Sequence, residues 1–177
     1  MPPRTDSFDL GGLRLSSGEG RRLELSVAVE PFVLGGEEYT VVNGSVVVHL
    51  DISRTTGQGY ALRLRFSAGL EGPCMRCLEA AMPSFDVDAY EVSQPGESEE
   101  LDSPYVEGGV LDLKAWVRDA LALVLPATLL CRPDCAGLCP VCGANLNEAE
   151  PGHHHEAAPD PRWAKLRELH FEGEARE

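Results

Sequence analysis

The spacing of six cysteines and three consecutive histidines is the feature that most constrains this 177-residue chain. Two pairs of cysteines are separated by two residues, Cys74 with Cys77 and Cys139 with Cys142; we call them the first and the second knuckle. Cys131 and Cys135 precede the second knuckle, and His153, His154 and His155 follow it. A Cys-x2-Cys spacing lets the chain turn tightly and offer two sulfurs to one ion, as structural zinc sites require. The pattern therefore predicts zinc.

The number of candidate ligands favours two zinc sites, because the four knuckle cysteines alone would fill one tetrahedron. In one partition Cys74 and Cys77 join Cys131 and Cys135. Cys139 and Cys142 then combine with His153 and His155, since alternate residues of an extended segment project to the same side. A second partition joins both knuckles around one ion and leaves Cys131 and Cys135 to the histidines. We prefer the first.

These residues allow other interpretations. A redox dithiol needs a thioredoxin-like βαβ setting, which this sequence does not suggest. The three histidines could instead form an exposed polar stretch, and we expect the lone histidines, His49 and His170, at the surface. Arg63, Arg65 and Arg76 could form a basic patch, although a solvated strand face is the better account. A catalytic zinc normally keeps an open position and has fewer thiolates, so we expect no enzyme.

The charge and hydropathy of the chain argue against several classes of protein. The formal net charge is −14, and residues 93–112 contain six acidic and no basic side chains. Such a chain repels nucleic acid and suits a basic protein partner. No apolar run approaches the ~20 residues of a membrane span, and residues 1–15 lack the apolar stretch of a signal peptide. We therefore expect a cytoplasmic protein, without membrane or small-molecule ligands, in which clustered cysteines bind metal rather than form disulfides.

The first half of the chain alternates between apolar and polar residues, which is typical of antiparallel β-structure with one buried face. The alternation covers residues 21–30, 45–52, 60–70 and 84–90, and residues 34–36, 43–44 and 56–59 carry turn signals. In the first of these runs, Leu23, Leu25, Val27 and Val29 share one face, opposite Arg22, Glu24, Ser26 and Glu30. We expect a small antiparallel sheet or an open barrel.

A helix should follow an acidic loop at residues 93–109. Asp112 is a plausible N-cap, and Pro126 ends the pattern. The apolar residues at helical spacing, which we expect to pack on the sheet, are Leu113, Trp116, Val117, Ala120, Leu121 and Val124. Asp160 and Pro161 predict the start of a short terminal helix. The fold class is thus α+β, with a domain at residues 1–130 and a zinc-binding segment at residues 131–177.

Several strings in this chain are similar to those of the YceD family of bacterial and plastid proteins, the large ribosomal RNA subunit accumulation proteins. The most specific runs from Cys135 to Asn147, CAGLCPVCGANLN, and the resemblance also covers Cys74-Met-Arg-Cys77, residues 110–113, Leu125-Pro126 and residues 160–162. Relatives without the second knuckle keep a pair of ligand residues at positions 131 and 135, which favours the first partition. Many relatives carry Cys-x-Cys where this chain has His153-His154-His155.

The resemblance implies a process rather than a reaction: accumulation of large-subunit (23S) ribosomal RNA during ribosome assembly. We therefore expect a non-enzymatic assembly factor, stabilised by zinc, that contacts a basic ribosomal protein or a pre-ribosomal particle. The alternative is direct RNA binding in ribosomal RNA processing, through residues 131–147. Residues 113–147, which contain that segment, have a side-chain charge of only +1, which thiolates would reverse.

Overall fold

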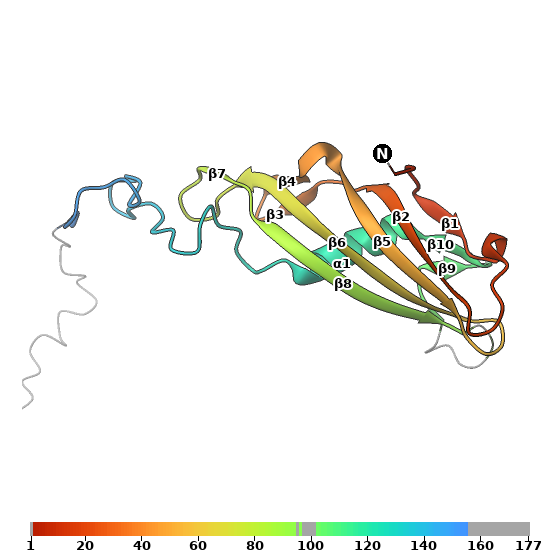
Figure 1. Cartoon of the computed structure of the whole chain (residues 1–177). Helices are drawn as coiled ribbons and strands as arrows, with labels where there is room; N and C mark the ends of the chain where they lie inside the picture. The colour runs from red at the N-terminus through yellow and green to blue at the C-terminus, as the bar shows by residue number, and fades with distance from the viewer. Residues whose placement is uncertain (1, 95, 97–101, 156–177) are drawn as a thin grey trace, which may run out of the picture.

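The computed structural model describes residues 2–94, 96 and 102–155 and consists mainly of antiparallel β-structure with one α-helix (Figure 1). The larger sheet has seven strands, in the order β2-β5-β6-β4-β3, with β7 and β8 also paired to β6. Its strands are β2 (Gly20–Ala28), β3 (Phe32–Leu34), β4 (Glu37–Val41), β5 (Ser45–Arg54), β6 (Tyr60–Pro73), β7 (Ala80–Ala81) and β8 (Ser84–Ser93). The expected antiparallel sheet is therefore present, and it is long and open.

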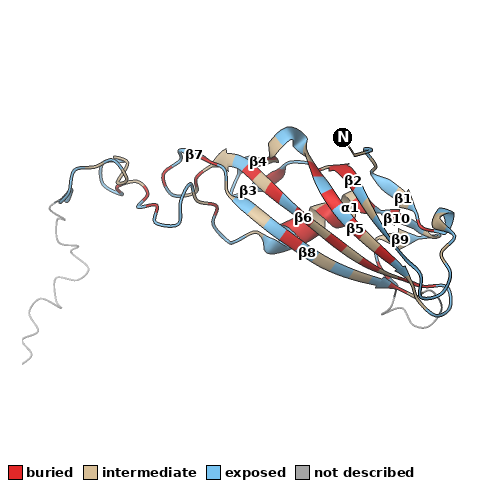
Figure 2. Ribbon diagram, in the orientation of Figure 1, coloured by how far each residue is buried: buried red, intermediate tan, exposed pale blue. Residues whose placement is uncertain are grey.

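Alternating side chains give this sheet one buried and one wet face. On β5, Val46, Val48, Leu50 and Ile52 are buried, whereas Val47 and His49 are exposed. The buried residues of β2, β5, β6 and β8 form one core together with α1 (Figure 2). The four runs of alternation in the sequence correspond to these four strands, because each strand is long enough for the period of two to be visible.

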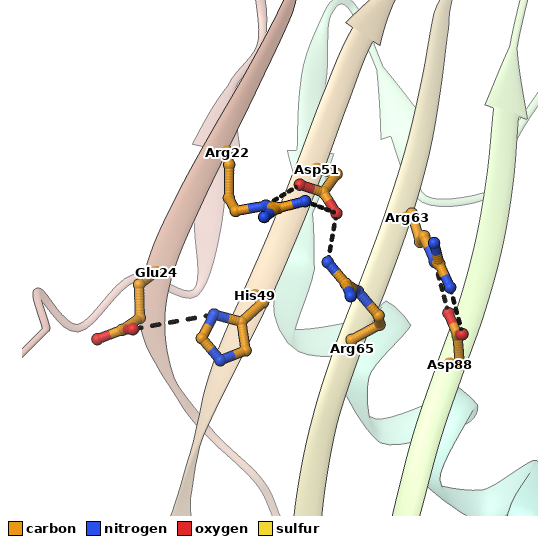
Figure 3. A network of polar contacts seen from close by, with 7 residues as sticks. All are labelled: Arg22, Glu24, His49, Asp51, Arg63, Arg65 and Asp88. Atoms are coloured by element: carbon orange, nitrogen blue, oxygen red, sulfur yellow. Dashed lines mark hydrogen bonds and ion pairs between the residues drawn. The ribbon is translucent and has the colours of Figure 1, made fainter.

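Cross-strand ion pairs cover the wet face of the sheet (Figure 3). Asp51 on β5 accepts hydrogen bonds from Arg22 on β2 and from Arg65 on β6, the latter at 2.7 Å. Arg63 donates two hydrogen bonds to Asp88 on β8, at 2.9 and 2.7 Å. Arg63 and Arg65 thus belong to a solvated strand face, as the sequence indicated, and do not form an unneutralised basic patch.

Helix α1 (Leu113–Val124) begins and ends where the sequence predicted. The carboxylate of Asp112 accepts a hydrogen bond of 3.0 Å from the amide of Ala115, which confirms Asp112 as the N-cap. The residues that pack on the sheet are Leu113, Trp116, Val117, Ala120 and Leu121. Val124 was also expected on this face, but it is 40% exposed because it occupies the last helical position, beyond the cover of the sheet.

A second sheet of three strands was missed by the sequence analysis. It consists of β1 (Ser7–Asp9), β10 (Val110–Asp112) and β9 (Val106–Glu107), in that order. The prediction of a loop over residues 93–109 is therefore wrong at its C-terminal end, where the Gly108-Gly109 turn joins β9 to β10. Strands of two or three residues are too short to show alternation, so pairing with the N-terminal β1 decides their structure.

One side chain that was expected on the wet face is buried. Ser26 is only 6% exposed, because the N-terminal segment lies along β2. Its amide donates to the Pro3 carbonyl at 3.0 Å, and its carbonyl accepts from Thr5 at 2.9 Å. The predicted terminal helix at Asp160 and Pro161, together with His170, lies outside the described residues, so the domain division at residue 131 stays a prediction. None of the described helices is long and apolar enough to cross a membrane.

Candidate metal centre

The first knuckle lies at the end of the longest strand of the sheet. Cys74 directly follows Pro73, the last residue of β6, and the hydroxyl of Tyr39 donates a 2.8 Å hydrogen bond to the Pro73 carbonyl. The knuckle then turns back into β7, which pairs with β6. Cys131 and Cys135 arrive from the chain after α1, so the fold joins segments about sixty residues apart in sequence.

Four sulfurs gather there in a group that we call cluster 1: Cys74, Cys77, Cys131 and Cys135, whose ligand atoms lie within 4.8 Å of one another. The sulfurs of Cys74 and Cys135 are 3.7 Å apart, and those of Cys77 and Cys131 are 3.6 Å apart. A tetrahedral metal with bonds of about 2.3 Å to sulfur has edges of about 3.8 Å. The spacing therefore fits a four-thiolate metal site and is far longer than a disulfide bond of about 2.05 Å.

Backbone hydrogen bonds fix the shape of the first knuckle. The amide of Cys74 donates to the Glu79 carbonyl at 2.7 Å, and the amide of Leu78 donates to the Cys74 carbonyl at 2.9 Å. Leu78 has a positive φ of 63°. Because a bulky residue rarely adopts this conformation, the closed turn must hold it in place.

The two halves of cluster 1 are also joined to each other. The amide of Met75 donates to the Leu129 carbonyl at 2.8 Å, and the guanidinium of Arg76 donates to the Cys135 carbonyl at 3.0 Å. The side chain of Asn147 donates to the sulfur of Cys135 at 3.5 Å. Its oxygen accepts from the Ala136 amide at 2.8 Å. Such contacts orient metal ligands.

In cluster 1, burial and hydrogen bonds shift the pKa values of two thiols in opposite directions. Burial alone raises the pKa of Cys74, but the backbone amides of Cys77 and Arg76 outweigh it and lower the pKa to about 6. Burial and the hydrogen bond with Cys77 raise the pKa of Cys131. Cys74 and Cys135 are 0% and 1% exposed, whereas Cys131 is the accessible member. Four thiolates this close together would repel one another and would require a cation.

The second group, cluster 2, consists of Cys139, Cys142, His153 and His155. The Nε2 atom of His155 lies 3.2 Å from the Cys142 sulfur and 3.1 Å from the Nε2 atom of His153. The Cys142 sulfur is 3.5 Å from His153 Nε2. A tetrahedral ion bound by two sulfurs and two imidazoles has edges of about 3.3–3.8 Å. Cluster 2 is therefore compact enough for a single ion.

A tight turn holds the second knuckle. The amide of Gly143 donates to the Cys139 carbonyl at 2.8 Å, and Gly143 has a φ of 73°, the left-handed conformation expected of this glycine. The backbone amides of Cys142 and Val141, with the His153 ring, lower the pKa of Cys139 to about 6. Cys139 is buried, but the other three members of cluster 2 are exposed.

The structure places the predicted residues in the same two groups as the first partition of the sequence analysis. The two knuckles are not combined in one group, as the second partition required. The ring of His154 instead contacts the Gly152 carbonyl, at 2.6 Å from Nδ1. The binding of a metal by either group stays a prediction. With four protein donors each, the two clusters resemble closed structural sites rather than catalytic ones.

Two residues around cluster 1 were not predicted to have a role. The sequence indicates Asn147 only as the end of a string, and Arg76 only as part of the first knuckle and of a possible basic patch. Their contacts with Cys135 depend on the path of residues 131–147 around the first knuckle. Nothing in the local sequence could have indicated these contacts except the presence of both residues in the family-like strings.

Comparison with known proteins agrees with the family resemblance that these strings indicate. The family model described as "Large ribosomal RNA subunit accumulation protein YceD" matches residues 62–170. The chain belongs to the YceD family. The match begins within β6 and includes all eight members of the two clusters.

Several mycobacterial proteins are similar to this YceD member over most of its length. An uncharacterized protein of Mycobacterium tuberculosis (strain H37Rv) and one of Mycobacterium bovis are each 36% identical over 163 residues, which cover 88% of this chain and 78% of theirs. An uncharacterized protein of Mycobacterium leprae is 32% identical over 161 residues, covering 85% of this chain and 73% of its own. No solved structure matches.

The YceD string from Cys135 to Asn147 links the two clusters in space. Cys135 belongs to cluster 1, Cys139 belongs to cluster 2, and Asn147 returns to cluster 1. Gly137 has a φ of 79°, and a Cβ atom there would lie 3.2 Å from the Arg76 carbonyl oxygen. The same carbonyl accepts a 3.2 Å hydrogen bond from the Leu138 amide. A glycine is needed because the string passes so close to the first knuckle.

Proposed function

We propose that this protein is a non-catalytic assembly factor that supports the accumulation of large-subunit (23S) ribosomal RNA in the cytoplasm. The observation that carries the proposal is the YceD family match over residues 62–170. The two four-donor groups support the non-catalytic part, because neither geometry reserves a ligand position for a substrate.

We further propose that each cluster binds one zinc ion. Cluster 1 would supply four thiolates, and cluster 2 two thiolates and two imidazoles, both of which are common structural zinc sets. Bound zinc would stabilise the deprotonated sulfurs and join the chain after α1 to the end of β6. Few large apolar side chains surround residues 131–155, so metal would take the place of a core in this segment.

The partner that we propose is a basic protein, such as a ribosomal protein, rather than naked RNA. The net charge of −14 supports this choice. The basic residues near the clusters are already engaged: Arg76 contacts the Cys135 carbonyl, and Arg132 contacts both Asn147 and Asp134. Few cations therefore remain for phosphate contacts in this region.

Deletion of the gene, in a bacterium that carries it, tests the proposed process. The ratio of 23S to 16S ribosomal RNA should fall in the deletion strain and recover on expression of the wild-type chain, but not of a Cys74→Ser/Cys77→Ser variant of equal abundance. An unchanged ratio in the deletion strain would contradict the proposed function.

A crosslinking pull-down with and without ribonuclease tests the partner. Recovery of a basic ribosomal protein after ribonuclease treatment supports the proposal. Recovery of free ribosomal RNA without any ribosomal protein would favour the alternative, direct RNA binding. Binding of purified protein to this RNA should then weaken steeply with salt.

A further inference from the structure

Strand β8 forms an edge of the larger sheet. Within the described residues it pairs only with β6, through ten consecutive partners from Ser84 to Ser93. In Figure 1 it runs along the lower border of the sheet, with α1 behind it. A long edge strand is a template for another strand unless something covers it.

The hydrogen-bond register shows which backbone groups face outward. The Leu70 amide donates to the Pro83 carbonyl at 3.0 Å, in register with the pairing of Gly69 and Ser84. Since hydrogen-bonded and non-hydrogen-bonded pairs alternate in an antiparallel ladder, the odd-numbered residues of β8 bond to β6. The N–H and C=O groups of the even-numbered residues, including Asp88 and Tyr90, therefore point toward the free edge.

A groove of about 280 Å³ follows this edge. Its strand side is formed by five consecutive residues, Val87 to Glu91. Because consecutive side chains point to opposite faces, a groove lined by all five must run along the edge itself. The opposite wall is mostly apolar and consists of Tyr105, Trp116, Ala120, Leu123 and Val124. Leu123 is 85% exposed.

The charged residues that line this groove are acidic. Its lining contains Asp88 and Glu91 but no lysine or arginine. Tyr105, which also lines it, donates to the Asp119 carboxylate at 3.2 Å. Asp88 is neutralised by Arg63, and Arg118 lies 3.7 Å from Asp119, which leaves Glu91 as the lining carboxylate that has no ion pair among the described residues. The whole of β8 has three acidic and no basic residues.

We propose that the groove between β8 and α1 binds an extended basic segment of a protein partner as an added β-strand. The free backbone groups of β8 would pair with the segment, the apolar wall would receive alternate side chains, and the carboxylates would select lysine or arginine. A second copy of the chain is a poorer occupant, because it would bring two acidic edges together. The inference rests on the proposed function, since it locates the basic partner.

A ten-residue peptide that alternates lysine and valine is a suitable probe. Fluorescence anisotropy with the full-length, zinc-loaded chain should show saturable binding, and the matched glutamate–valine peptide should bind at least about tenfold more weakly. Methylation of alternate backbone nitrogens of the lysine peptide, which removes its N–H donors along one edge, should abolish binding.

Tyr90 provides a matched pair of variants on the protein side. Tyr90→Pro removes an outward N–H group, which an edge strand tolerates, whereas Tyr90→Thr keeps that group and removes only the aromatic ring. Tyr90→Pro should weaken peptide binding by about tenfold or more, and Tyr90→Thr by much less. Leu123→Gln, at an exposed position, should weaken binding through the opposite wall. Circular dichroism should show that all three variants are folded.

Several results would overturn the inference: no binding of the lysine peptide, equal binding of the glutamate peptide, or unchanged binding by Tyr90→Pro. Dimers that dissociate on Tyr90→Pro substitution would assign the edge to a second copy instead. The in vivo arm separates this inference from the proposed function. A Tyr90→Pro strain with normal 23S ribosomal RNA would reject the groove alone, whereas a deletion strain with normal RNA would reject the function.

Discussion

At the scale of single residues, Asn147 shows how a side chain outside the ligand set can shape the candidate site. It contacts the sulfur of Cys135, the amide of Ala136 and the guanidinium of Arg132 at once. These contacts set the direction of one sulfur of cluster 1 and hold the loop from which it projects. The sequence contained this asparagine in a specific string, but its role depends on a turn that closes only in the folded chain.

Replacement of Asn147 by alanine should therefore weaken metal binding at cluster 1. Loss of such an orienting contact typically lowers metal affinity by about 10–100-fold. Competition with a chromophoric zinc chelator would measure the change. Gln58→Ala, which removes an exposed amide in the distant β5–β6 loop, is the control and should bind zinc like the wild type. Equal affinities in the two variants would contradict this role of Asn147.

A second prediction at this scale concerns Asp51. The hydrogen bond from Arg22, reinforced by Arg65, lowers the pKa of Asp51 below its ordinary value of 3.8, against an opposing effect of burial. A carboxyl whose pKa falls on folding stabilises the folded state above that ordinary value, and the stabilisation disappears as the pH falls through the folded pKa.

Asp51→Asn should accordingly lower the free energy of unfolding by about 1 kcal/mol at pH 7, a modest value because the ion pairs are partly exposed. The difference from wild type should shrink as the pH falls below 3.8 and vanish once the pH is below the folded pKa of Asp51. Urea unfolding of both proteins at several pH values would measure it, with Glu38→Gln on β4 as the control. A difference that persists undiminished at pH 2.5 would show that the effect is not electrostatic.

At the scale of elements, the length of each strand or helix decided whether the sequence could predict it. The four long strands and α1 were visible because each repeats its pattern several times and ends at a clear signal, such as the Asp112 cap or Pro126. The shorter strands were not visible, and β1, β9 and β10 of the second sheet are examples. They exist because β1 pairs with a segment about one hundred residues away, and local pattern contains no information on that pairing.

Helix α1 also contains a natural comparison between a buried and an exposed residue. Trp116 is 2% exposed and packs in the core, whereas Leu123 is 85% exposed. Trp116→Ala should lower the free energy of unfolding by about 3–5 kcal/mol, because it leaves a large cavity. Leu123→Ala should change it by less than about 0.5 kcal/mol. Chemical denaturation would measure both, and similar losses would contradict the observed orientation of α1.

At the scale of the whole molecule, two regions differ in how many side chains they contribute to the apolar core. The sheet and α1 share an extensive apolar core, while residues 131–155 contribute few apolar side chains to it. Cluster 1 lies where the two regions meet, and cluster 2 lies beyond it. In Figure 1 the chain after α1 extends past the end of the sheet near β7. Loss of cluster 2 should thus leave the sheet unaffected.

Cys139→Ser tests this separation. If each cluster binds zinc as proposed, the variant should lose about one of two zinc ions per chain. Residues 136–155 should become sensitive to protease, because the proposed ion would substitute for a core there. The sheet should keep its circular dichroism spectrum. Elemental analysis and limited proteolysis would measure the changes, with Cys74→Ser as the variant that removes the other ion. Unchanged protease resistance of Cys139→Ser would refute the structural role of cluster 2.

The sequence by itself determined the β-rich character, the position of α1 and which residues are candidate ligands. It could do so because alternation, capping and cysteine spacing are local patterns. Each of them was either repeated along the chain or specific for one kind of structure. Only the tertiary structure decided that Cys74 and Cys77 meet Cys131 and Cys135, and that Asn147 and Arg76 hold them. It also decided that β8 is an edge strand beside α1 in the described part of the chain. These features depend on which distant segments approach one another, and that is settled by the packing of the whole chain around one core.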